Sequence, residues 1–129
     1  MIQVCVDGSF RNGKGSIAVI AYRDKRRILT FGRAVKVKNN NEAEFLAVLA
    51  ALKALKSKKN LEIILLSDSK AVMTELTEHR DSKVKKLNEY TKRIFKEAEA
   101  FKKLKFRWAA RGQTLEANNI AKEITKKDK

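Results

Sequence analysis

Alternation between apolar and polar residues at the start of the chain predicts β-strands. Residues 2–6 read Ile-Gln-Val-Cys-Val, and residues 16–22 carry a second apolar run that indicates a largely buried strand. Residues 12–15 lie between them, read Asn-Gly-Lys-Gly, and contain residue types that tolerate positive φ. Residues 28–37 are rich in β-branched and aromatic side chains and predict a third strand, which Gly32 interrupts. This part of the chain is therefore predicted to form an antiparallel three-stranded meander.

After the third strand the apolar spacing becomes that of a helix. The consecutive residues Asn39, Asn40 and Asn41 offer N-cap chemistry, and Asn40 or Asn41 is the expected cap. The helix is expected to run to about residue 58, with a broad apolar face built by Ala43, Phe45, Leu46, Leu49, Leu52 and Leu55. Residues 62–67 then carry the continuous apolar run Ile63-Ile64-Leu65-Leu66, which is typical of a strand that helices bury on both faces.

The remaining residues predict three more helices and a fifth strand. Helical spacing covers residues 69–77 and residues 84–104, alternation returns in residues 104–110, and residues 115–126 predict a last helix. The element order is therefore β-β-β-α-β-α-α-β-α. It predicts an α/β fold with a five-stranded mixed sheet and helices on both faces, in a single domain over residues 1–129.

Charge and cysteine content limit the binding partners and the cellular compartment that we expect for this chain. The chain has 30 Lys and Arg against 15 Asp and Glu, a net charge of +15, which favours a nucleic-acid partner. Lysines on exposed helices that only increase solubility are the alternative explanation. A single cysteine, Cys5, cannot form an internal disulfide and is expected to be a buried thiol, as in a reducing compartment. We found neither a membrane-spanning run nor a signal peptide, so we expect a cytoplasmic protein without a membrane partner, and a monomer.

Three carboxylates stand at positions that a mixed sheet can bring together. Asp7 ends the first strand, Glu44 lies in the first turn of the first helix, and Asp68 ends the fourth strand. If those two strands are parallel neighbours, their carboxyl ends meet at a crevice. Gathered acids need a cation among them, and their oxygens suit magnesium or manganese. Each acid alone also has a structural explanation, as a turn residue or as a favourable charge at a helix N-terminus.

The same residues carry a resemblance to a known family. Residues 6–9 (Val-Asp-Gly-Ser) before a glycine-containing hairpin, residues 40–45 (Asn-Asn-Glu-Ala-Glu-Phe) and residues 67–69 (Ser-Asp-Ser) resemble the three leading motifs of type 1 ribonuclease H. Residues 108–111 and 116–121 resemble the final motif of that family. Each motif alone is weak, but four in the expected order over nearly the whole chain indicate a ribonuclease H-like fold.

This resemblance implies an endonuclease that hydrolyses the RNA strand of RNA–DNA hybrids and leaves 5′-phosphate and 3′-hydroxyl ends. It implies two Mg²⁺ ions, with Mn²⁺ as a substitute, at a catalytic and metal-binding set made of Asp7, Glu44, Asp68 and Asn118. It also implies nucleic-acid contacts by Gly8, Ser9, Asn39, Asn40, Asn41, Lys70 and Arg111.

Asn118 departs from the family, which has a fourth acid at that position. An amide offers one neutral oxygen ligand where a carboxylate offers two oxygens and a charge, so one metal ion would be held more weakly. Three explanations stay open: a natural enzyme that works with three acids, an engineered substitution, or a natural binding domain that has lost turnover. A basic structural protein of a ribonucleoprotein particle is a further alternative, in which the placement of the three acids is chance.

Trp108 is expected in the core, because alternation places it on the same strand face as Phe106. A base-stacking platform is the alternative role for this side chain.

Overall fold

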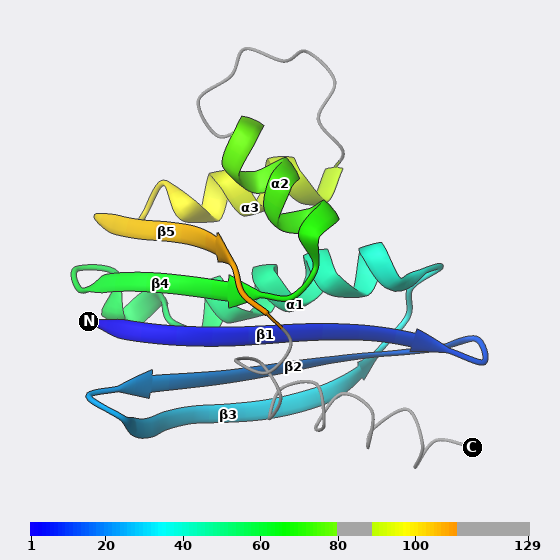
Figure 1. The fold of residues 1–129 in the computed structure, drawn as a ribbon, viewed down its shortest axis with the longest axis horizontal. Coiled ribbons are helices and arrows are strands. Elements are labelled where there is room, and N and C mark those ends of the chain that lie inside the picture. The colour runs from blue at the N-terminus through cyan, green and yellow to red at the C-terminus, as the bar shows by residue number, and fades with distance from the viewer. Residues whose placement is uncertain (80–88, 111–129) are drawn as a thin grey trace.

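The computed structural model describes residues 1–79 and 89–110 of the chain (Figure 1). The meander is formed by β1 (Ile2–Arg11), β2 (Lys14–Arg23) and β3 (Arg26–Val35). It is followed by α1 (Asn40–Ala54), a short 3₁₀ turn η1 (Lys56–Lys58) and β4 (Glu62–Ser67). The last described elements are α2 (Lys70–His79), α3 (Glu89–Ala98) and β5 (Lys103–Trp108).

All five strands belong to one mixed sheet with the order β3-β2-β1-β4-β5. The pairs β1–β2 and β2–β3 are antiparallel, whereas β1–β4 and β4–β5 are parallel. This confirms the predicted α/β class and the five-stranded mixed sheet. Because β1 and β4 are parallel neighbours, residues that follow their carboxyl ends lie at the same edge of the sheet.

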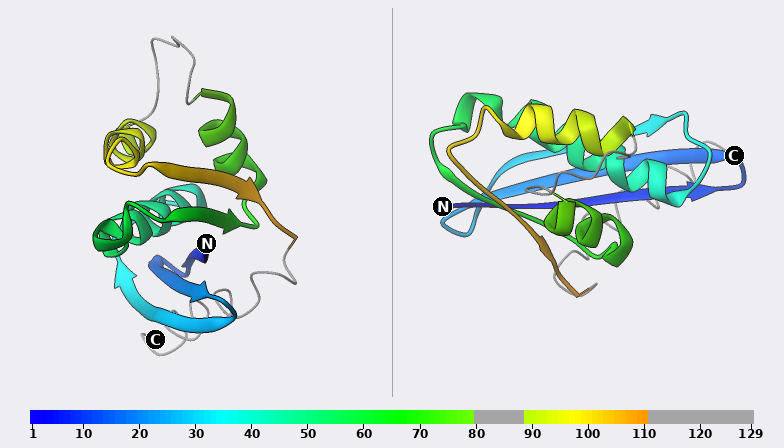
Figure 2. Two further views of the ribbon diagram at one scale, coloured as in Figure 1. Left: turned by 90° about the vertical axis from the view of Figure 1, so that its left-hand side faces the viewer. Right: turned by 90° about the horizontal axis from the view of Figure 1, so that it is seen from above.

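The helices cover the sheet around one large core. Helix α1 packs on β1 and against α3, and α2 packs against β5 (Figure 2). Buried side chains from α1, α2, α3 and one face of the strands form this core, including Val4, Val48, Leu65, Met73 and Ile94. A smaller cluster on the other face contains Cys5, which is buried as predicted and forms no disulfide within the described residues, together with Ala18, Ile20, Leu66 and Ala109. The helix expected over residues 115–126 lies outside the described residues.

Both hairpins of the meander turn through residues with positive φ. Asn12 (φ 52°) and Gly13 (φ 76°) connect β1 to β2, as the sequence predicted. Asp24 (φ 51°) and Lys25 (φ 67°) connect β2 to β3. Two-residue hairpins of this kind favour Asn-Gly or Asp-Gly, so lysine is an unfavourable residue at the second position.

Replacing this lysine with glycine is expected to stabilise the protein. Lys25→Gly creates an Asp-Gly turn and removes the steric penalty of a side chain at φ 67°. The expected gain is about 0.5–1 kcal/mol in the free energy of unfolding, measured by urea denaturation. Lys25→Ala, which removes the same charge but keeps a Cβ, is the control and should give much less; an equal gain from alanine would contradict this explanation.

Several element boundaries differ from the sequence predictions. Strand β3 runs without a break through Gly32, which pairs with Ala18, and the irregularity in the meander falls between Ala21 and Tyr22 instead. The long helix predicted over residues 84–104 ends at Ala98, because the residues that follow form hydrogen-bonded turns and do not continue the helix. No helix within the described ranges is long and apolar enough to cross a membrane.

Candidate active site

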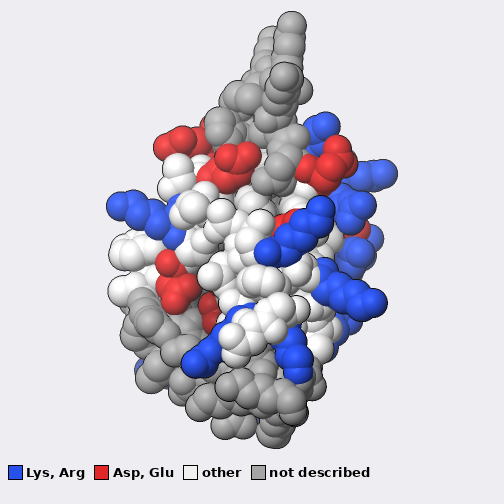
Figure 3. All heavy atoms as spheres, turned by 90° about the vertical axis from the view of Figure 1, so that its right-hand side faces the viewer, with Lys and Arg blue, Asp and Glu red and all other residues white. Residues whose placement is uncertain are grey.

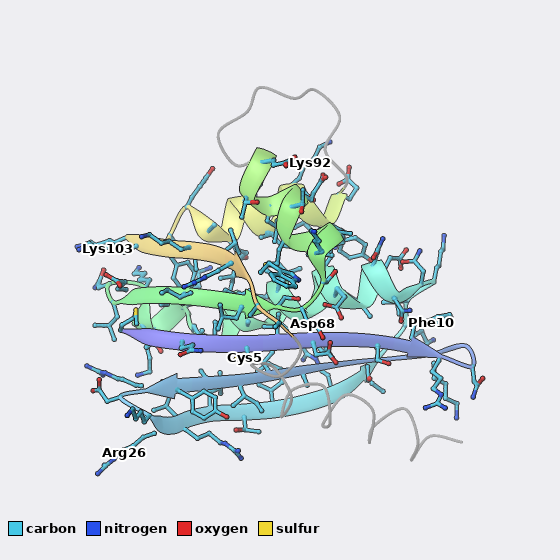
Figure 4. All side chains as sticks on the ribbon, viewed as in Figure 1. Cys5, Phe10, Arg26, Asp68, Lys92 and Lys103 are labelled. Atoms are coloured by element: carbon cyan, nitrogen blue, oxygen red, sulfur yellow. The ribbon has the colours of Figure 1, made fainter. Side chains whose placement is uncertain are left out.

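The three predicted acids meet at one edge of the sheet. Asp7 lies in β1. Glu44 lies in α1, just after its first turn and not within it as predicted. Asp68 directly follows β4 (Figure 4). One carboxylate oxygen from each residue lies within 4.8 Å of the other two. The side chains of Asp7 and Glu44 are buried, and that of Asp68 is half-buried. This grouping argues against chance placement of the three acids.

A close approach of β1 to α1 brings Glu44 to Asp7. The backbone N–H of Gly8 donates a hydrogen bond of 2.9 Å to Oε1 of Glu44. A Cβ at position 8 would overlap the backbone of Ala43 and Glu44, so only glycine permits this contact. Gly8 was predicted as a nucleic-acid contact; the structure gives it a packing role between the strand and the helix.

A serine that sequence reasoning did not single out also holds Glu44. The hydroxyl of Ser67 donates a hydrogen bond of 3.1 Å to Oε2 of Glu44 and accepts one of 3.0 Å from the backbone N–H of Ser69. Ser67 is fully buried at the end of β4, directly after four apolar residues. A hydroxyl at such a position was a usable signal, because buried polar groups are hydrogen-bonded. Both oxygens of Glu44 are therefore fixed by groups that come from β1 and β4.

The clustered carboxylates of the site favour a bound cation. Burial, followed by the negative charge of Asp7, raises the pKa of Glu44 from 4.5 to about 9, although the N–H of Gly8 partly opposes this; a hydrogen bond with Asp7 and the charge of Asp68 raise it further. Without a positive charge, one proton is therefore retained near neutral pH. Three clustered carboxylates are hard oxygen ligands, and this donor set fits a divalent ion such as Mg²⁺ or Mn²⁺.

This pKa predicts how stability depends on pH when divalent metal is chelated. Since the folded-state pKa of Glu44 exceeds its unfolded value, the folded protein holds the extra proton between pH 4.5 and about 9. The contribution of Glu44 is therefore lost as pH rises through that window, by at most about 1.4 kcal/mol per pH unit. Thermal unfolding in EDTA measures this loss. Glu44→Gln should flatten the dependence, and an unchanged slope in that variant would contradict the assignment to Glu44.

Comparison with known protein families identifies the family to which this chain belongs. The family described as "Reverse transcriptase-like" matches residues 5–124, which is nearly the whole chain. The chain belongs to the reverse transcriptase-like family. A search among curated protein sequences gives no match.

Solved structures that are similar to this reverse transcriptase-like chain include ribonucleases H. RNase H1 from the halophilic archaeon Halobacterium salinarum NRC-1 is 22% identical, with a TM-score of 0.85 over 98% of both chains. LC11-RNase H1, isolated from compost and solved in complex with RNA/DNA hybrid, is 20% identical, with a TM-score of 0.83 over 99% of both chains. The N-terminal RNase H domain of rv2228c from Mycobacterium tuberculosis, solved as a fusion with maltose-binding protein, is 20% identical, with a TM-score of 0.80 over 96% of this chain and 94% of that one. The predicted ribonuclease H-like fold is confirmed.

The three asparagines of this reverse transcriptase-like domain have different environments. Asn39, and not the expected Asn40 or Asn41, is the N-cap of α1, and its side chain accepts a 2.9 Å hydrogen bond from the N–H of Glu42. The cap lies one residue earlier because Oδ1 of Asn40 instead accepts a 2.8 Å hydrogen bond from the N–H of Phe10. The helix N-terminus is thus tied to the end of β1, and within residues 1–79 and 89–110 the amide nitrogen of Asn40 donates no hydrogen bond.

Trp108 is not in the core, contrary to the sequence prediction. Its side chain is 50% exposed, whereas Phe106 is buried. The alternation ends here because β5 ends at Trp108 and its indole Nε1–H donates a 3.2 Å hydrogen bond to the carbonyl oxygen of Asp68. The indole therefore lies beside the acidic site, and its hydrogen bond helps to fix the backbone of Asp68.

Loss of the hydrogen bond from Trp108 to the backbone of Asp68 is expected to weaken metal binding. Trp108→Phe keeps an aromatic ring but loses the N–H that reaches Asp68. One neutral hydrogen bond contributes about 1 kcal/mol, which corresponds to a roughly fivefold weaker affinity for Mn²⁺. Electron paramagnetic resonance of free Mn²⁺ measures this affinity, and Phe106→Leu, a buried change on the same strand, controls for loosening of β5. Wild-type affinity in Trp108→Phe would contradict the positioning role.

The other predicted site residues lie around the acids or outside the described residues. Ser9 follows Gly8 in β1, Asn41 is exposed in the first turn of α1, and Lys70 is exposed at the start of α2, two residues after Asp68. Asn118 and Arg111 lie outside the described residues. The roles of all these residues in binding stay predictions.

Proposed function

We propose that this chain is a metal-dependent endonuclease that hydrolyses the RNA strand of RNA–DNA hybrids and leaves 5′-phosphate and 3′-hydroxyl ends. The convergence of Asp7, Glu44 and Asp68 within 4.8 Å, on a ribonuclease H-like fold, is the observation that carries this proposal. The complex of LC11-RNase H1 with a hybrid, although that protein is only 20% identical, supports the choice of substrate.

Asp7, Glu44 and Asp68, with Asn118, would hold two Mg²⁺ ions, with Mn²⁺ as a substitute. Bound ions of this kind supply an activated water and stabilise the oxygen that leaves the phosphodiester. The chain itself supplies preorganisation, because Gly8 and Ser67 fix both oxygens of Glu44. Fixed ligands cost little reorganisation when the phosphate arrives.

Hybrid binding in this proposal relies on groups that border the acids. The amide nitrogen of Asn40, with Asn39, Asn41, Gly8 and Ser9, would face the minor groove of the hybrid, where 2′-hydroxyls distinguish RNA from DNA. Lys70 and Arg111 would contact phosphates. We further propose that the protein acts in the cytoplasm, as a monomer.

A second candidate function is supported by Asn118. A domain with three acids and one amide could bind hybrids without turnover, as a nucleic-acid-binding module. The two candidates make opposite predictions for the chain as it stands and for Asn118→Asp.

Cleavage of an end-labelled RNA–DNA hybrid in Mg²⁺, in Mn²⁺ and in EDTA tests the proposal. We expect cleavage of the RNA strand with either metal, none in EDTA, and faster cleavage by Asn118→Asp, which restores a negative ligand. Duplex DNA of the same sequence is the control substrate. Binding without cleavage in the chain with Asn118, with cleavage gained only in Asn118→Asp, would instead support the binding module.

A further inference from the structure

Basic side chains gather at the end of the sheet opposite the acids. This distal basic edge consists of exposed residues at the starts and ends of strands and in the adjoining loops: Arg23, Lys25, Arg26, Lys59, Lys102 and Lys103. Strand register places them together. Arg23 pairs with Arg26 and with Ile2, Ile2 pairs with Ile63, and the neighbouring Glu62 pairs with Lys103.

Loop contacts complete this edge. The backbone N–H of Lys102 donates a 3.0 Å hydrogen bond to the carbonyl oxygen of Lys59, so the loops before β4 and β5 lie side by side. Arg26 and Lys103, from the two outermost strands, lie at the same end of the molecule (Figure 4). Four gaps of about 4.8 Å between strands give the edge a width of about 19 Å.

The distal basic edge is separate from the candidate active site. Asp7 lies five residues along β1 from Ile2, which corresponds to about 17 Å at about 3.3 Å per residue. The opposite end of the molecule, seen in Figure 3, carries acidic as well as basic side chains. At the distal edge the acidic residues Asp24, Glu62 and Glu99 are outnumbered by the six cations.

Lys103 lies opposite Glu62, but one pair of these cations is unfavourable for the fold alone. Arg23 and Arg26 are direct cross-strand partners, and like charges in that position destabilise a hairpin. Lys59, Lys102 and Lys103 form no ion pair within the described part of the chain. A bound polyanion would relieve this repulsion.

We propose that the distal basic edge binds the phosphate backbone of a second nucleic-acid segment, apart from the one at the acids. At about 3.4 Å of rise per phosphate along one strand, an edge about 19 Å wide faces five or six phosphates. Exposed point charges without a hydrogen-bonding pocket suit a backbone contact that does not depend on base sequence. This inference goes beyond the proposed function and does not require turnover.

A charge-removal variant tests this binding. The distal variant carries Arg23→Gln, Arg26→Gln, Lys59→Gln and Lys103→Gln, and the matched control carries Arg11→Gln, Lys14→Gln, Lys92→Gln and Lys96→Gln. The probe is a fluorescein-labelled single-stranded DNA of 12 nucleotides in EDTA, followed by anisotropy at several salt concentrations. We expect the distal variant to bind at least about tenfold more weakly, with a log–log salt slope smaller by about 3.

The other readouts separate this inference from loss of folding and from failure of the proposed function. Relief of the Arg23–Arg26 repulsion should raise the thermal unfolding midpoint of the distal variant above that of the wild type. If the chain cleaves hybrids, cleavage of a hybrid short enough to cover only the acids should change less than about twofold. Absence of cleavage in the wild type would refute the nuclease but leave the DNA-binding result intact.

Equal weakening of DNA binding in both variants would overturn the inference, because it would show binding spread over the whole basic surface. Wild-type binding by the distal variant would overturn it too. Charge-dependent binding at this edge to phosphatidylserine vesicles, without binding to the oligonucleotide, would identify a membrane partner instead and also overturn it.

Discussion

Asp7→Asn is expected to abolish hybrid cleavage, with a loss of at least about 10³-fold in kcat/KM. Asp7 is buried and lies within 4.8 Å of both other acids, so its carboxylate is central to the proposed metal site. Loss of one charged ligand removes several kcal/mol of stabilisation from the reaction, and each 1.36 kcal/mol is a factor of ten. Initial rates on a labelled hybrid in saturating Mg²⁺ measure the effect.

The same substitution at another aspartate separates catalysis from folding. Asp24→Asn changes an exposed turn residue at the distal end of the sheet, where φ is 51° and asparagine is well tolerated. Its cleavage rate should equal that of the wild type. Asp7→Asn should fold, and in EDTA near neutral pH it should be at least as stable as the wild type, because the charge that raises the pKa of Glu44, and with it the cost of keeping that carboxyl protonated in the folded protein, is gone. Residual cleavage by Asp7→Asn well above about a thousandth of the wild-type rate would contradict the proposed role.

Gly8→Ala is expected to disrupt both the fold and the site. The added Cβ would overlap three backbone atoms of Ala43 and Glu44, none of which belongs to a flexible side chain. Helix α1 must then move away from β1, and the hydrogen bond from the Gly8 N–H to Glu44 is lost. We expect a destabilisation of about 3 kcal/mol or more, measured by urea denaturation, and loss of cleavage in whatever protein remains folded.

A second glycine in the same hairpin provides the control for this variant. Gly13 has φ 76°, and a Cβ added to it would point into open space, so Gly13→Ala meets strain but no clash. Its expected penalty is about 1 kcal/mol, with normal cleavage. Similar stability losses in the two variants would show that close packing of β1 on α1 is not what Gly8 provides.

The periodicity of apolar residues and the N-cap residues predicted the strands and the helix that position the three acids. The run at residues 62–67 is apolar enough to indicate a central strand, and β4 is indeed paired on both sides, with β1 and β5. That pairing is also why Asp7 and Asp68 could be placed together from the sequence alone. Glu44 followed from the start of α1, which three asparagines marked to within one residue.

Other features depend on contacts that a linear pattern does not contain. The end of a strand does not reveal that Trp108 turns outward to a carbonyl of Asp68, because that partner lies 40 residues away in sequence. The hydrogen bond between Ser67 and Glu44 likewise joins two elements that are distant in the chain. The premature end of α3 at Ala98 arises from a local turn that apolar spacing alone does not reveal.

Anomalous diffraction from crystals grown with Mn²⁺ tests the central claim most directly. The account predicts an anomalous peak with carboxylate oxygens of Asp7, Glu44 and Asp68 at about 2.0–2.3 Å, typical of hard divalent ions. Crystals of Asp7→Asn under the same conditions should lose it. Manganese bound elsewhere on the protein, with none between these three side chains, would contradict the account.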